Sequence, residues 1–167
     1  MIIRKISLKK LHFPGDVEYE LQLTIQKLNE KGYQILSIIK VNYGFLIVYR
    51  IVFKDTSLIE EDTIKLKISI ITRKGMYFPE PYLNAFYMGD ERKRIELADI
   101  YMESQLRNLG YGTVLIKHLI NIAINNGVEY IKGFMVSDDE KHRLIQTHFY
   151  EKSGFEVNGS SLLWGNK

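Results

Sequence analysis

The sequence contains no cysteine, and this absence excludes disulfide bonds, thiolate metal sites and cysteine nucleophiles together. It also lacks an excess of charge of one sign. The 23 basic and 20 acidic residues give a formal net charge of +3 and no basic stripe, which argues against a nucleic-acid-binding protein. The four histidines show no metal-ligand spacing, and no G-x-S-x-G motif occurs. We therefore expect neither a metal site nor a serine hydrolase.

A long apolar run free of charge is missing as well. Residues 33–53 come nearest, but Lys40 and Arg50 interrupt them and would be costly inside a bilayer. Their Ile, Val, Tyr and Phe content favours strands, and "VNYG" is typical of a turn, so we expect a hairpin with strands at about 33–40 and 44–53. The start "MIIRKISLKK" has no apolar segment long enough for a secretory signal. These features predict a soluble, cytoplasmic protein that does not bind membranes.

Residues 1–54 are predicted to form a small β-α-β-β unit. It begins with a strand at "MIIRKISL" and continues with a helix that Asp16 caps and Gly32 ends. Apolar residues recur at helical spacing along one face of this helix: Val17, Leu21, Ile25 and Leu28. Two interpretations stay open, since the unit is either a separate module or the extended N-terminal part of the fold that follows. The polar stretch "KDTSLIEEDT" between the two parts is predicted to be a linker or a loop.

Residues 63–167 show a β-β-β-α-β-α-β order, which predicts a mixed α/β sheet with crossover helices. The predicted strands and helices are strands 63–72, 82–89, 94–102, 128–136 and 160–165, a helix at about 111–126, and a second helix that ends at Ser153-Gly154. The stretch "RKGMYFPEP" is predicted to be a loop. The first helix is apolar nearly all round and is expected to be buried on most sides. The second is expected to turn four residues inward: Leu144, Ile145, His148 and Phe149.

The stretch "IELADIYMESQLRNLGYGTVLIKHL" places Gly110 and Gly112 at the start of the first of these helices. A helix N-terminus presents unpaired N–H groups, and glycines let a diphosphate approach them, with Arg107 as an added cation. We expect the space beside Gly112 to face the ligand, so that Gly112→Arg would abolish cofactor binding and leave the fold intact. A P-loop does not fit, because Thr113 stands where Lys is required. A dinucleotide fingerprint fits poorly, because Leu115 replaces its third glycine. A glycine-rich turn without a ligand also stays open.

Two motifs in a fixed order point to a family. The loop residues 107–112 fit the pattern Gln/Arg-x-x-Gly-x-Gly/Ala, and "HFYEKSGFEV" follows after a helix, a strand and a helix. In both motifs residues 63–167 resemble the GNAT superfamily of N-acetyltransferases. The resemblance implies a mixed sheet that splays at its middle and a loop and helix that hold the diphosphate of acetyl-CoA. The cofactor-binding residues it implies are Ile100, Tyr101, Met102, Arg107, Asn108, Leu109, Gly110, Tyr111, Gly112 and Thr113.

The reaction that the resemblance implies is direct transfer of an acetyl group from acetyl-CoA to a primary amine of a small molecule or protein. Glu96 matches a glutamate that serves as general base in some members, and Tyr150 matches the general acid. Asp99 is the reserve base, expected by strand alternation on the opposite face from Glu96. The backbone near Met102 would hold the thioester carbonyl. Arg143 stands where the family often has a cofactor-binding Asn.

Other interpretations remain beside this one. The chain is alternatively a catalytically silent acyl-CoA-binding or interaction module, or a nucleotide-binding oxidoreductase or methyltransferase. The N-terminal unit is open to a role in acceptor recognition, regulation or dimerisation, and the last of these would make the protein a homodimer. "RKGMYFPEPY" is a candidate acceptor-side loop in which Glu80 would attract a cation. The sequence does not identify the acceptor amine.

Overall fold

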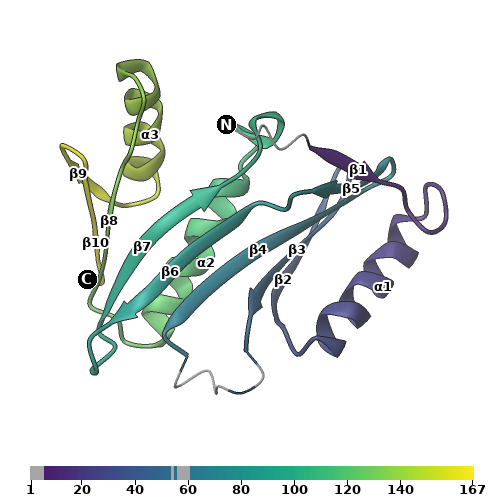
Figure 1. Cartoon of the computed structure of the whole chain (residues 1–167), viewed down its shortest axis with the longest axis horizontal. Coiled ribbons are helices and arrows are strands. Elements are labelled where there is room, and N and C mark those ends of the chain that lie inside the picture. The colour runs from purple at the N-terminus through teal and green to yellow at the C-terminus, as the bar shows by residue number, and fades with distance from the viewer. Residues whose placement is uncertain (1–5, 54, 56–60) are drawn as a thin grey trace.

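The computed structural model describes residues 6–53, 55 and 61–167 of the chain as one ten-stranded sheet with three α-helices and a short 3₁₀ helix (Figure 1). The strands are β1 (Ser7–Lys9), β2 (Gln34–Val41), β3 (Gly44–Ile51), β4 (Thr63–Thr72), β5 (Gly75–Phe78), β6 (Tyr82–Met88), β7 (Arg94–Tyr101), β8 (Tyr130–Phe134), β9 (Glu156–Asn158) and β10 (Ser161–Gly165). The helices are α1 (Val17–Glu30), η1 (Ser104–Leu106), α2 (Tyr111–Asn125) and α3 (Glu140–Lys152).

The strands follow the order β1-β5-β4-β6-β7-β8-β10-β9, and β3 and then β2 continue the sheet along the other edge of β4. Among the pairings of the described residues, β7–β8 is parallel and the others are antiparallel. The predicted mixed α/β sheet is therefore confirmed. Within the described part of the chain, no helix is both long and apolar enough to cross a membrane.

Two short strands were missing from the sequence prediction. The predicted loop "RKGMYFPEP" contains β5, which pairs with the end of β4 and with β1, and the end of the chain contains β9 beside β10. Strands of three or four residues are too short to show a period, and the partner of β5 lies far away in sequence. The strand predicted at the N-terminus falls partly on residues 1–5, which lie outside the described residues, as does most of the predicted linker at 54–63.

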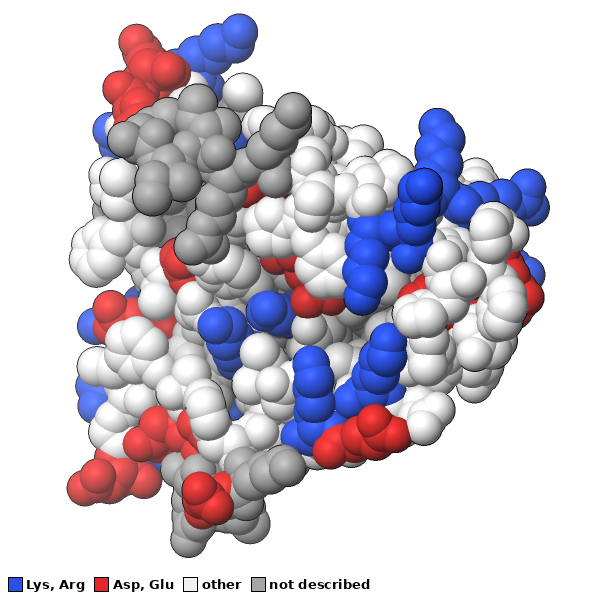
Figure 2. All heavy atoms as spheres, turned by 45° about the vertical axis from the view of Figure 1, so that its right-hand side comes forward, with Lys and Arg blue, Asp and Glu red and all other residues white. Residues whose placement is uncertain are grey.

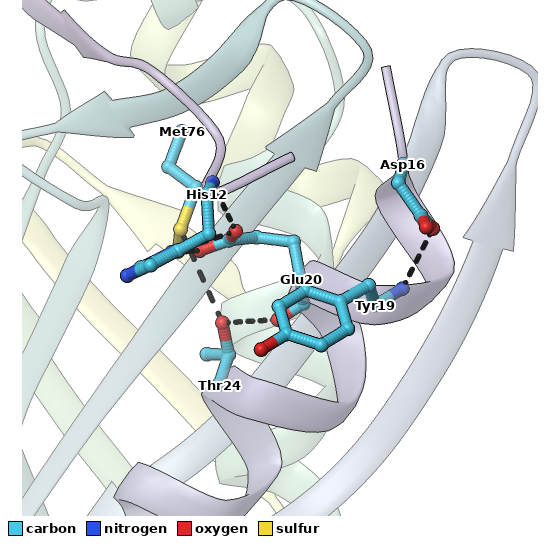
Figure 3. A network of polar contacts seen from close by, with 6 residues as sticks. All are labelled: His12, Asp16, Tyr19, Glu20, Thr24 and Met76. Carbon is cyan, nitrogen blue, oxygen red and sulfur yellow. Dashed lines mark hydrogen bonds and ion pairs between the residues drawn. The ribbon is translucent and has the colours of Figure 1, made fainter. Parts of the chain in front are cut away.

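The N-terminal hairpin and helix are confirmed close to their predicted limits. Asp16 caps α1, because its side chain accepts a hydrogen bond from the Tyr19 backbone N–H at 2.9 Å (Figure 3). β3 pairs with β2 on one side and, over its own full length, with β4 on the other. The strands of the first 54 residues therefore belong to the same sheet as those that follow. Whether the two parts are separate domains stays a prediction.

The loop before α1 is tied to that helix through a buried carboxylate, Glu20 (Figure 3). One of its oxygens accepts the His12 backbone N–H at 3.0 Å and lies 3.0 Å from His12 Nδ1. Burial alone would raise the pKa of Glu20, but the hydrogen bonds from the His12 backbone and ring outweigh it and hold that pKa below its usual value. The Thr24 hydroxyl donates to the Glu20 carbonyl and contacts the Met76 sulfur.

The two faces of the sheet are covered by different helices. α2 lies behind the sheet in Figure 1 and packs on the larger apolar cluster, whereas α1 covers the opposite face of β3 and the end of β4. Strand β4 alternates between the faces: Ile64 and Leu66 are fully buried on the α2 side, and Lys65 and Lys67 point the other way. Along β4 and β6 this second face is polar and partly open.

α2 and α3 differ from the sequence prediction in how deeply they are buried. α2 buries one face, including Leu115 and Leu119, but Ile124 on its far side is about half exposed. α3 buries no residue completely, and Leu144 and Ile145, predicted to face inward, are exposed together with His148. The reason is visible in Figure 1, where the first turns of α3 extend beyond the end of the sheet and only its last turn approaches the core.

Candidate active site

The parallel strands β7 and β8 separate halfway along their length. Arg94 to Leu97 pair with Tyr130 to Gly133, and no pairing between the two strands continues beyond Leu97. Figure 1 shows β7 and β8 running together at their starts and then diverging, β7 towards η1 and α2 and β8 towards α3. The edge of β7 after Leu97 therefore has backbone groups that β8 does not pair. This opening confirms the splayed sheet that the sequence motifs implied.

A β-bulge in β7 lies at the point of separation. Ala85 of β6 pairs with Leu97 and the next residue, Asn84, pairs with Asp99, which leaves Ala98 as an extra residue. Residues paired across antiparallel strands share a face of the sheet. Because Phe86 and Asn84 share a face and pair with Glu96 and Asp99, these two carboxylates lie on the same face as well. The expectation that alternation would place them on opposite faces is wrong, since the bulge shifts the alternation by one residue.

The glycine loop leads from β7 into α2. Asn108 and Gly110 have positive φ values of 62° and 88°, and Gly110 occupies the N-cap position of α2 without any side-chain cap. A Cβ built on Gly110 would meet no atom within 4 Å. The first amides of α2 have no acceptor within the helix, so this terminus offers N–H donors and a partial positive charge to an anion. Exposed residues surround it in the loop: Arg107, Asn108, Leu109 and Gly110.

Gly112 has a different role from the one expected. A Cβ at Gly112 would lie 3.2 Å from Met102 Cε and 3.2 Å from two ring carbons of Phe149. Protein side chains from the end of β7 and from α3 therefore lie where a side chain at Gly112 would point. The missing side chain lets α2, α3 and the end of β7 approach closely. A side chain at Gly112 would require Met102 or Phe149 to shift, so the structure does not support the expectation that Gly112→Arg leaves the fold intact. Thr113, Ile100, Tyr101 and Met102 are half-buried nearby.

Tyr150 and Asp99 lie on the two sides of the opening. Tyr150 sits on the last turn of α3, and its ring packs edge-to-face against Phe149 and Phe155 at 4.9 and 5.7 Å between centroids. Burial, and after it the negative charge of Asp99, raises the pKa of Tyr150 to about 12. Tyr150 therefore keeps its proton at neutral pH. Asp99 itself is exposed.

The other predicted site residues have other neighbours. Glu96 lies in the paired half of β7, where its carboxylate is 3.8 Å from Lys132 Nζ of β8. Arg143 on α3 is exposed, and its guanidinium lies beside Gly159 in the turn between β9 and β10. The structure therefore brings Asp99 and Tyr150 to the opening. Glu96 lies before the opening, in the paired half of β7, and its carboxylate is next to the Lys132 ammonium.

The N-terminal hairpin contacts α2 at two points that the sequence did not reveal. In the β2–β3 turn the Tyr43 hydroxyl lies 2.7 Å from the hydroxyl of Tyr111, the first residue of α2. Burial and this hydrogen bond raise the pKa of Tyr111. Two turns further on, His118 Nδ1 donates to the Val114 carbonyl at 2.8 Å, so its Nε2 accepts from the Ser37 hydroxyl at 2.8 Å. The start of α2 is thus held by residues from the first third of the chain.

A pocket of about 380 Å³ opens on the polar face of the sheet, the face on which Glu96 and Asp99 also lie. Its walls come from β4, β6 and the segment between β5 and β6: Lys65, Lys67, Phe78, Pro79, Glu80, Tyr82 and Asn84. Glu80 is almost fully buried, accepts from the Tyr49 hydroxyl at 2.7 Å and from Ser69, and lies 3.8 Å from Lys67 Nζ. Glu80 was expected to attract a cation from solution, but its oxygens already have partners within the protein. A hollow of about 490 Å³ elsewhere is lined by α1 alone.

Comparisons with known proteins agree with this geometry. The model of the acetyltransferase (GNAT) family matches residues 77–155. No curated protein matches the sequence significantly. Among solved structures, a point mutant of a cAMP-binding acyltransferase from Mycobacterium smegmatis is 13% identical with a TM-score of 0.56, over 92% of this chain and 54% of its own. An IAA acetyltransferase from Bacillus cereus is 12% identical with a TM-score of 0.54, over 72% and 99%.

A third likeness covers nearly the whole chain. A putative acetyltransferase of the GNAT family from Desulfovibrio desulfuricans is 10% identical with a TM-score of 0.50, over 96% of this chain and 99% of its own. Identities this low show a shared fold only. The family assignment rests on the match of residues 77–155, which span β7, the glycine loop, α2 and the signature at the end of α3. Residues 77–155 therefore form an acetyltransferase domain of the GNAT family.

Proposed function

We propose that the protein is an N-acetyltransferase that moves an acetyl group directly from acetyl-CoA to a primary amine. The observation that carries the proposal is the opening between β7 and β8, which ends beside the uncapped N-terminus of α2. A strand edge that its neighbour β8 no longer pairs and an uncapped helix terminus suit a ligand with an amide-containing arm and a diphosphate. Acetyl-CoA has both parts and supplies the acetyl thioester.

The residues at the opening fit this co-substrate. Gly110 leaves the α2 amides uncovered, and Arg107 in the exposed loop adds a cation that can pair with phosphate. Backbone N–H groups of β7 near Ile100 to Met102 are candidates to bind carbonyl oxygens. A backbone donor of this kind is worth about 3–4 kcal/mol when it stabilises a developing oxyanion.

The acceptor amine must lose a proton before it reacts. With a pKa of about 10.4 only about 0.04% of a lysine-like amine is neutral at pH 7, a penalty of about 4.6 kcal/mol. Asp99 is the stronger candidate for the base, because it lies beyond the bulge on the open polar face, close enough to the opening for its charge to act on Tyr150. Glu96 remains the alternative, although its carboxylate already lies beside the Lys132 ammonium.

Tyr150 is proposed to donate to the sulfur of the leaving thiolate. Its pKa of about 12 lies above the thiol value of about 8.5, so complete proton transfer would be unfavourable by about 5 kcal/mol. A hydrogen bond to the thiolate is the favourable contribution, with water completing the protonation. We expect Tyr150→Phe to lower kcat by about 10² while the affinity for acetyl-CoA stays within twofold. An unchanged kcat would leave Tyr150 with a packing role only.

The first experiment compares thermal unfolding with acetyl-CoA, CoA, NAD and S-adenosylmethionine. A ligand at 100 times its Kd adds about 2.7 kcal/mol, which raises the Tm by several degrees. Stabilisation by acetyl-CoA and CoA alone supports the proposal. Stabilisation by NAD or S-adenosylmethionine instead would contradict it and favour the oxidoreductase or methyltransferase alternative.

A turnover assay separates an enzyme from a silent acyl-CoA-binding module. The release of free CoA thiol is measured over a panel of amines, with Asp99→Asn and Glu96→Gln compared as matched isosteric variants. We expect Asp99→Asn to lower kcat/KM by about 10²–10⁴, whereas Glu96→Gln has the smaller effect. Binding of acetyl-CoA without turnover of any amine would favour the silent module.

A further inference from the structure

The geometry points to a specific class of acceptor. We propose that the acceptor is a small amine that also carries an anionic group, a carboxylate or a phosphate, and that Lys65 with Lys67 binds this group in the pocket between β4 and β6. The inference rests on the proposed function and adds the acceptor's chemistry to it. Figure 2 shows Lys and Arg side chains gathered around the middle and right of the face it presents, with acidic side chains between them.

The charge of the pocket favours an anion. Its walls carry two lysines against one carboxylate, Glu80, which leaves one net positive charge. Lys65 Nζ lies 5.6 Å from the centre of the Tyr82 ring, and among the described residues no carboxylate is within ion-pair distance of it. The Lys65 ammonium has three N–H donors. Its contact with the Tyr82 ring is a cation–π interaction and does not provide a hydrogen-bond acceptor for these donors. Lys65 is therefore the cation available to a ligand.

The buried carboxylate in the pocket is already satisfied by the protein. Glu80 accepts hydrogen bonds from Tyr49 and Ser69, and it lies next to Lys67. This arrangement holds the Lys67 ammonium at the pocket while using only part of its donor capacity. A cationic ligand would have to compete with Lys67 for Glu80 and would meet Lys65 as a like charge. The pocket therefore selects against a second amine at this end of the acceptor.

The strand register places the pocket opposite the reacting end. Lys65 pairs with Asn84 and Asn84 pairs with Asp99, so the three side chains form one row across β4, β6 and β7 on the same face. Neighbouring strands lie about 4.8 Å apart, so the row spans roughly 10 Å from the lysine to the aspartate. An amine at Asp99 and an anion at Lys65 thus define an acceptor with opposite charges at its two ends.

The size of the pocket favours a small molecule over a protein. Its volume of about 380 Å³ lies at the small end of ligand pockets, and α1 limits the open face on the side of β3. Asn84 in the middle of the row offers an amide donor and acceptor to the chain between the two charged ends. These features suit a flexible amine with a terminal acid.

The test measures acetyl transfer to matched pairs of amines by the full-length protein. The pairs are 6-aminohexanoate with hexylamine, 4-aminobutyrate with butylamine and O-phosphoethanolamine with ethanolamine, and 1,5-diaminopentane serves as a dication. We expect kcat/KM about tenfold or more higher for the anionic member of at least one pair, since a charged hydrogen bond contributes this much. The carboxylate and phosphate pairs show which anion the site prefers. Equal rates within every pair, or a preference for diaminopentane, would overturn the proposal.

Variants and a binding measurement complete the test. Lys65→Ala should remove the preference within a pair, Lys65→Glu should reverse it towards diaminopentane, and the control Lys93→Ala, from an exposed ion pair with Glu129, should keep it. Binding of 6-aminohexanoate and hexylamine is followed by NMR titration without acetyl-CoA, so it is independent of turnover. Tighter binding of 6-aminohexanoate that Lys65→Ala removes supports the proposal, and equal binding contradicts it. Transfer without discrimination would contradict this inference and leave the acetyltransferase proposal standing.

Discussion

The two faces of the central sheet are made by the same strands but do different work. On the α2 side, β4 presents Ile64, Leu66 and Ile68, all fully buried. On the other side the same strand presents Lys65 and Lys67 to a partly open pocket. A strand alternates its side chains, so one sequence can hold the fold on one face and a site on the other. The apolar face is responsible for stability and the polar face is free for chemistry.

The comparison also applies along β7. Its first half pairs with β6 and β8, whereas in its second half the pairing with β6 continues and the pairing with β8 does not. The bulge at Ala98 lies between the halves and brings Asp99 onto the polar face. The polar face and the edge that β8 no longer pairs therefore meet at one place, beside the N-terminus of α2. The site arises where two departures from regular pairing coincide.

The largest expected effect comes from replacing, one at a time, two neighbouring residues of β4 whose side chains lie on opposite faces of the sheet. Leu66→Ala should lower the free energy of unfolding by about 2–5 kcal/mol, because the side chain is fully buried and leaves a cavity. Lys65→Ala should change it by less than about 0.5 kcal/mol. Chemical denaturation measured at one pH gives both values. Similar losses for the two variants would show that the faces are not divided in this way.

The next effect tests the close approach at Gly112. Gly112→Val should cost about 1–3 kcal/mol of stability, because its Cβ would meet Met102 and Phe149 at 3.2 Å. The control is a double mutant: in a Met102→Ala background the same change should cost clearly less, since one of the crowding groups is gone. Equal costs in both backgrounds, measured by denaturant unfolding, would mean that crowding is not the cause.

The sequence predicted the frame of the molecule better than the details of its site. The alternation in "TIKLKISIIT" and the caps of α1 are local signals, and both elements have the predicted limits. The bulge at Ala98 carries no such signal, because Ala is compatible with a regular strand. It alone changed the relation between Glu96 and Asp99. The partners of Glu80 come from β3 and β4, which are distant in sequence, and were equally hidden.

A smaller effect concerns Glu20, the buried carboxylate on α1 that binds the loop before the helix. The pKa of Glu20 is lowered in the folded protein, so its stabilising contribution is present above the unfolded value of about 4.3 and is lost as the pH falls through the folded pKa. Glu20→Gln keeps an acceptor for His12 but loses the charge, so we expect about 1 kcal/mol less stability at pH 7. The difference from the native protein should shrink below pH 4. A constant difference between pH 3 and 7, in urea unfolding, would contradict the pKa shift.

The smallest effect tests whether the N-terminal hairpin influences the glycine loop through its contact with the start of α2. Tyr43→Phe removes the hydroxyl that Tyr111 contacts at 2.7 Å and leaves the buried Tyr111 hydroxyl without that partner, at a cost of about 1 kcal/mol. Because Tyr111 is the first residue of α2 and lies between Gly110 and Gly112, we expect acetyl-CoA to bind a few-fold more weakly, measured by calorimetry. Tyr19→Phe is the matched control on an exposed tyrosine. If both variants bound acetyl-CoA like the native protein, the hairpin would contribute to the fold alone and would not influence binding at the glycine loop.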